Sequence, residues 1–78
     1  MGREIGDWRV NVSYLIVKRF DLDKVADKTI GKRHWASGSG FGRRDLSYDF
    51  KDEFSARIAS EKIKKDQRFQ VLLYQSKD

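Results

Sequence analysis

The 78-residue sequence predicts one α+β domain in which strands and helices alternate along the chain. Two observations predict it. Residues 9–17 and 44–50 alternate between apolar and polar side chains, which is the period of a strand with one buried face. Residues 52–65 carry apolar side chains at helical spacing. The chain has no cysteine, so its small core cannot be supplemented by disulfide bonds.

The first strand is expected over residues 9–17. Val10, Val12, Tyr14 and Ile16 fall on one face, which we expect to be buried. The residues before Trp8 and residues 76–78 are expected to be short tails.

A short helix is predicted over residues 22–30. Its apolar stripe consists of Leu22, Val25, Ala26, Thr29 and Ile30. Asp21 is placed to cap the first turn, and Gly31 suits the left-handed exit. A polar hairpin loop over the same residues is the alternative.

The segment after this helix is predicted to form a hairpin. Residues 32–36 would be an edge strand whose Lys32 and Arg33 blunt edge pairing. Residues 37–42, with the sequence SGSGFG, would be the tip. Residues 44–50 would return as a strand with Leu46, Tyr48 and Phe50 facing inward.

The main helix is predicted to open at Asp52 and to run to about residue 65. Its apolar stripe consists of Phe54, Ala56, Ile58, Ala59 and Ile63, with Ser60 among the polar residues opposite. Residues 69–74 then form the last strand.

The resulting order is strand, helix, strand, strand, helix, strand. Two helices can cover one face of a four-stranded antiparallel sheet, and this two-layer sandwich is the ferredoxin-like arrangement. Without the first helix, the same residues would give a three-stranded sheet with one helix.

About a third of the chain resembles the second half of an RNA recognition motif. The matching residues are Gly40, Phe41, Gly42, Phe50, Ala56 and Ala59. The resemblance implies a strand, helix, strand topology. It implies no base stacking on the sheet, because the positions that carry stacking aromatics in the family differ here. Gly42 is followed by Arg43, Arg44 and Asp45, and the first strand has Asn11 in place of the family's other stacking ring.

Charge also argues against ligand binding on the open face of the sheet. Asp45 and Asp49 would both lie there and repel phosphate. Arg9 is expected to form a cross-strand ion pair with one of them.

Nearly all of the net charge of +5 lies in one segment, residues 32–44. Residues 1–31 hold six basic and five acidic groups, residues 32–44 four basic and none acidic, and residues 45–78 seven of each. The candidate binding residues are Lys32, Arg33, His34, Trp35, Phe41, Arg43 and Arg44. Cations beside aromatic side chains are typical of phosphate contact combined with base stacking.

The sequence therefore predicts a small non-enzymatic protein that binds RNA or single-stranded DNA through this segment. The alternative partner is an acidic protein surface, which would make the chain a regulator or inhibitor of the kind that small phage or accessory proteins often are. The alternative without any binding role is a solvated edge hairpin whose charges only prevent aggregation.

No catalytic residue, metal ligand or cofactor site is expected. His34 is the single histidine and has no evident carboxylate partner in the sequence. Helix capping explains Asp21, Asp23 and Asp27 better than a calcium loop does. Trp8 and Trp35 are expected to pack in the core or at its rim.

The protein is expected to be cytoplasmic, with no membrane partner. No apolar run approaches the ~20 residues that span a bilayer, and the N-terminal stretch lacks the apolar core of a signal peptide. The sequence leaves the oligomeric state open.

Overall fold

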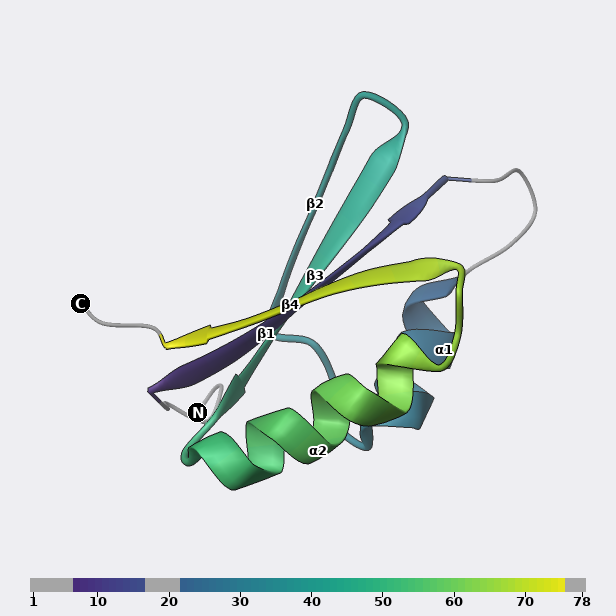
Figure 1. Ribbon diagram of the computed structural model, residues 1–78. Helices are drawn as coiled ribbons and strands as arrows, with labels where there is room; N and C mark the ends of the chain where they lie inside the picture. The colour runs from purple at the N-terminus through teal and green to yellow at the C-terminus, as the bar shows by residue number, and fades with distance from the viewer. Residues whose placement is uncertain (1–6, 17–21, 76–78) are drawn as a thin grey trace.

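The computed structural model describes residues 7–16 and 22–75. Its elements are β1 (Trp8–Leu15), α1 (Leu22–Ile30), β2 (Ala36–Gly40), β3 (Arg43–Phe50), α2 (Glu53–Lys64) and β4 (Phe69–Gln75). The strands form one antiparallel sheet in the order β2-β3-β1-β4, and both helices lie on the same side of it (Figure 1). The predicted four-stranded α+β architecture is confirmed, and the three-stranded alternative is wrong.

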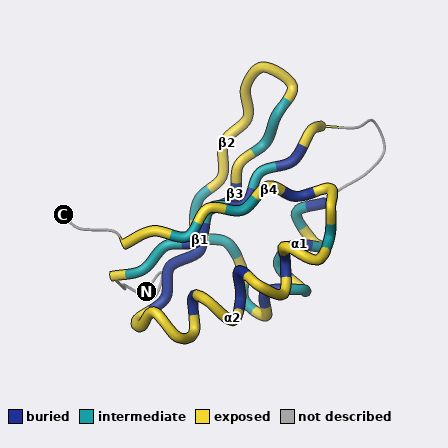
Figure 2. The backbone as a smooth tube through the Cα atoms, in the orientation of Figure 1, coloured by how far each residue is buried: buried dark blue, intermediate teal, exposed yellow. Residues whose placement is uncertain are grey.

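The core lies between the helices and one face of β1 and β3. Val10 is opposite Tyr48 on β3, and Val12 is opposite Leu46. All four side chains are buried, as the alternation of the sequence predicts. Figure 2 shows that the exposed residues gather toward the far end of the β2-β3 hairpin, away from the helices.

Helix α1 has the predicted bounds. Leu22, Ala26 and Ile30 are buried, and each follows the last by about one turn. Gly31 ends the helix with φ 94°, and its N–H donates to Asp27 O at 2.8 Å. The alternative of a polar loop is wrong. The predicted cap at Asp21 lies outside the described residues.

The hairpin differs from the prediction. The edge strand β2 covers residues 36–40 and not 32–36, so the predicted six-residue tip shrinks to Phe41 and Gly42. The reason is that the segment before β2 is held by side-chain contacts to α1 and β3, described below. A strand of Ala, Ser and Gly can still pair with β3, because the hydrogen bonds between the two strands are made by backbone groups alone.

Helix α2 begins after Asp52 as predicted, and the Asp52 carboxylate accepts from Ser55 N at 2.7 Å. The predicted apolar stripe is correct at Ala56, Ala59 and Ile63, which are buried, but wrong at three other positions. Phe54 and Ile58 are exposed, whereas Ser60 is buried and donates to Arg57 O.

The buried face of α2 consists of Ala56, Ala59, Ser60 and Ile63. Three of these side chains are small, so the helix can approach the sheet and α1 closely, and a phenylalanine would not fit there. The hydrogen bond to its own helix allows Ser60 to be buried without an unpaired hydroxyl.

Ile16 was also predicted wrongly, because its side chain is exposed. Its N–H donates to Gly42 O at 2.8 Å, so it lies level with the hairpin turn. That turn projects beyond the rest of the sheet (Figure 1), where the core ends. Val17, the last residue of the predicted strand, lies outside the described residues.

Candidate nucleic-acid interface

The hairpin turn presents Phe41 to solvent. Gly40 pairs with Arg43, which leaves Phe41 and Gly42 as a two-residue turn with φ angles of 51° and 78°. Two positive φ angles are typical of a type I′ turn, which favours Asn or Gly at both positions. Phe41 is 108% exposed, so no packing compensates the strain of its left-handed backbone. An aromatic residue kept in such a position is a candidate contact residue.

Arg43 lies across the open face of the sheet. Its guanidinium donates to Ser13 Oγ at 3.0 Å on β1 and to Gln70 Oε1 at 2.8 Å on β4. Both acceptors are neutral. These contacts fix the side chain without offsetting its charge, so a phosphate could replace them.

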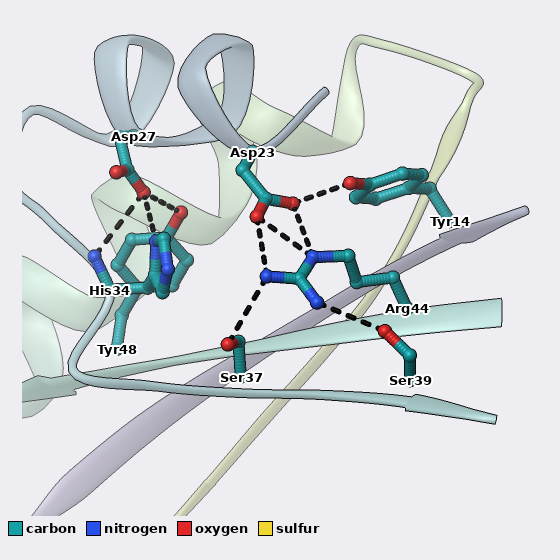
Figure 3. Close-up of polar contacts among 8 residues, drawn as sticks. All are labelled: Tyr14, Asp23, Asp27, His34, Ser37, Ser39, Arg44 and Tyr48. Carbon is teal, nitrogen blue, oxygen red and sulfur yellow. Dashed lines mark hydrogen bonds and ion pairs between the residues drawn. The ribbon is translucent and has the colours of Figure 1, made fainter. Parts of the chain in front are cut away.

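Arg44 points to the other face, toward α1 (Figure 3). Its Nε and Nη2 both contact the Asp23 carboxylate, at 2.8 and 2.7 Å from Oδ2. The same guanidinium donates to Ser37 and Ser39 of β2. Arg44 therefore joins the helix to the edge strand and supports the fold of the hairpin.

Asp23 is the acceptor that organises this contact. Burial opposes its ionisation, but the hydrogen bonds from Arg44 and Tyr14 outweigh that effect and hold the pKa of the Asp23 carboxyl below its usual value. The carboxylate is thus charged at neutral pH and binds Arg44 as an ion pair.

One turn further along α1, Asp27 holds the segment that leads into β2 (Figure 3). Its Oδ1 accepts from Tyr48 OH at 2.6 Å and from the backbone N–H of His34 at 3.2 Å, and it lies 2.8 Å from His34 Nδ1. Burial and the hydrogen bond to Asp27 raise the pKa of the Tyr48 hydroxyl, which stays protonated and donates.

These contacts correct two predictions. His34 does have a carboxylate partner, which is Asp27. Asp23 and Asp27 face Arg44, Tyr48 and His34, so capping does not explain them. Two features of the sequence indicate these contacts. Two aspartates four residues apart share one helix face, and tyrosines predicted to be buried need hydrogen-bond partners.

Lys32 is also engaged within the fold. Its ammonium donates to the carbonyl oxygen of Asp49 and lies 4.5 Å from the centre of the Phe50 ring. Arg33, by contrast, is exposed. The four cations of the segment therefore have different surroundings. Strand alternation separates Arg43 from Arg44, but the partners that hold each side chain are distant in the sequence and could not be predicted from it.

The open face of the sheet carries less negative charge than expected. Asp49 is only 2% exposed, and its Oδ1 accepts from Arg9 Nε at 2.9 Å, which confirms the predicted cross-strand ion pair. Trp8 packs against the core as predicted, whereas Trp35 is exposed, with its ring 5.0 Å from the Arg9 guanidinium. Of the two expected carboxylates, Asp45 alone is exposed.

None of the protein-family models, curated proteins and solved structures compared with the chain matches it. Within residues 7–16 and 22–75, no three or more acidic, histidine or cysteine side chains are grouped so that they could hold a metal ion. The helices in this part of the chain are too short or too polar to cross a membrane.

Proposed function

We propose that the chain is a ferredoxin-like binding protein, not an enzyme, and that its 32–44 segment binds nucleic acid. The ferredoxin-like assignment is supported by the order of elements and by the strand order β2-β3-β1-β4, in which each helix connects two strands separated by a third. The Asp27 carboxylate accepts from Tyr48 OH and from the backbone N–H of His34 and lies 2.8 Å from His34 Nδ1, and these contacts position the loop before β2.

One observation carries the binding proposal: a fully exposed Phe41 stands two residues from Arg43, whose charge is not offset by its neutral partners. A ring without packing can stack on a base, and a guanidinium held by weak acceptors can bind a phosphate. Stacking requires an unpaired base, so the ligand class is RNA or single-stranded DNA.

The expected binding is weak. Lys32 and Arg44 are engaged within the fold, which leaves Arg33 and Arg43 as the cations best placed for phosphate. Two phosphate contacts on a single strand give a slope of log K against log salt of about −1.4.

The test uses Arg43→Ala, with Lys62→Ala on the exposed face of α2 as the matched control for loss of one charge. Arg44 is unsuitable, because its replacement would also break the contact with Asp23. The ¹⁵N-labelled proteins are titrated with short single-stranded RNA and DNA at low and moderate salt, and the amide shifts are followed by NMR.

We expect shifts confined to residues 32–44 and their neighbours on the open face, fading as salt rises. Arg43→Ala should weaken binding for every sequence and reduce the salt slope by about one contact, whereas Lys62→Ala should leave both nearly unchanged. Absence of shifts in the wild type at low salt would refute the proposal.

The second candidate is docking on a protein. It is favoured by the exposed Leu15 and Ile16, which lie level with the hairpin turn and so extend the apolar surface of Phe41. If Phe41→Ala abolishes the biological activity and Arg43→Ala does not, this candidate replaces nucleic-acid binding.

A further inference from the structure

Strand β4 forms the edge of the sheet opposite the hairpin. It pairs with β1 on one side, and no strand in the described part of the chain pairs with its other side. Proteins usually protect such an edge with charges, proline, a bulge or a covering segment. The seven residues of β4, FQVLLYQ, include no charge, no proline and no glycine. Among residues 7–16 and 22–75, this edge is therefore open to another strand.

Apolar side chains reinforce the open edge on both faces. Leu72, 66% exposed, and Tyr74 project on the open face, where they lie opposite Asn11 and Arg9 of β1. Val71 and Leu73 lie on the helix face and are only partly buried against the core. A strand added beside β4 would cover more of all four side chains.

We propose that the added strand is β4 of a second copy of this chain, in an antiparallel pair related by a two-fold axis at Leu72. This register places Leu72 opposite Leu72, Val71 opposite Leu73, and Gln70 opposite Tyr74. The three central positions thus bring apolar residues together, Phe69 at the end of the strand faces Gln75, and no charged side chain faces another within the pair. The two four-stranded sheets become one continuous sheet, with a closed and symmetric interface.

The opposite edge does not favour self-pairing. Strand β2 offers only Ala, Ser and Gly side chains, and the exposed Arg33 precedes it. Two copies paired there would bring like charges together, which is unfavourable. Association through β4 therefore stops at the dimer and leaves both hairpins at the far ends of the joined sheet.

Dimerisation through β4 does not depend on nucleic-acid binding, but it would affect the strength of that binding. Two hairpins at opposite ends of one rigid sheet could contact the same strand of nucleic acid, and the second contact would benefit from a high effective concentration. Avidity of this kind would offset the weak binding of each hairpin.

The experiment measures mass by sedimentation equilibrium, in the absence of nucleic acid, from micromolar to millimolar protein. The test variant is Leu72→Lys, which places two like charges opposite each other on the two-fold axis. The control is Phe54→Lys, which makes the same change at an exposed apolar side chain on α2. Circular dichroism verifies that both variants fold.

We expect the wild type and Phe54→Lys to reach twice the 9.2 kDa of one chain, while Leu72→Lys stays at 9.2 kDa. A wild type that remains monomeric at millimolar concentration, or that forms species larger than a dimer, overturns the proposal. So does a Leu72→Lys variant that still dimerises.

A charge-swap mixture tests the register itself. Leu72→Lys and Leu72→Glu should each be monomeric alone and should form a heterodimer when mixed, because the two-fold axis places residue 72 opposite itself. Failure of the mixture to associate would overturn the proposed register.

Discussion

At the scale of single residues, polar side chains decide how this hairpin is built. Strand β2 has almost no apolar side chain to bury, yet it is held in place because Arg44 joins Ser37 and Ser39 to Asp23. The loop before it is fixed by Asp27. Such charge-assisted hydrogen bonds are stronger than neutral ones and have defined geometry, so they can position a strand that packing cannot hold.

Phe41 is the residue at which stability and binding should oppose each other. Phe41→Asn gives the Asn-Gly pair that type I′ turns prefer, so the free energy of unfolding should rise by about 1 kcal/mol. The same change removes the ring that stacks on a base, which contributes about 1–3 kcal/mol to binding. Chemical denaturation and the NMR titration measure the two effects separately.

A decrease in stability of Phe41→Asn would contradict the view that its backbone is strained. An unchanged affinity for RNA and DNA would show that the ring does not contact nucleic acid.

At the scale of elements, helix α2 shows how packing selects among the apolar faces of one helix. Its sequence has more apolar side chains than the core can accept, and the structure buries the small ones together with Ile63. Close approach of α2 to the sheet gives better packing than burial of the larger Phe54 would, because interiors are filled to high density.

Two isoleucines of α2 provide a matched pair for testing this orientation. Ile63 is 0% exposed and Ile58 is 41% exposed. Ile63→Ala should lower the free energy of unfolding by about 2–5 kcal/mol, since it leaves a cavity. Ile58→Ala should change it by less than about 0.5 kcal/mol, as is usual at surface positions. Urea denaturation of both variants is the measurement, and equal losses would mean that α2 is rotated relative to the orientation described.

At the scale of the whole molecule, the helix layer and the sheet are joined by carboxylates as well as by the apolar core. Asp23 and Asp27 on α1 bind Arg44, Tyr14, Tyr48 and His34, which lie on or beside the sheet. The stability of the fold should therefore depend on pH on the acid side.

The direction of this dependence follows from three lowered pKa values. Hydrogen bonds from Ser55 lower the pKa of Asp52, those from Arg68 lower that of Asp66, and those from Arg44 and Tyr14 outweigh burial at Asp23. A carboxyl whose pKa is lower in the folded state stabilises the fold above its unfolded pKa of about 3.9, and this contribution is lost as the pH falls through the folded value.

The melting temperature should therefore be nearly constant from neutral pH down to about pH 5 and should fall below about pH 4. Thermal unfolding followed by circular dichroism across this range is the measurement. Asp23→Asn should be less stable than the wild type at neutral pH and should show a smaller acid dependence. A wild-type melting temperature that is constant to the lowest pH would contradict the assigned role of these carboxylates.

The sequence alone was sufficient for the elements whose local patterns are strong. The alternation in β1 and β3 determines which side chains enter the core, and the bounds of α1 follow from its apolar stripe and the glycine that ends it. The concentration of positive charge in residues 32–44 is likewise a property of the sequence. These features depend on residues close together in the chain, so they can be recognised without the fold.

Only the tertiary structure decided which of those cations remain available and which apolar side chains are buried. Arg43 and Arg44 are neighbours in sequence, but strand alternation sends one to the open face and the other to Asp23. Likewise, Ile58 and Ile63 look equivalent until α2 meets the sheet and α1. Each outcome depends on partners distant in sequence, and the chain specifies those partners only when its layers pack together.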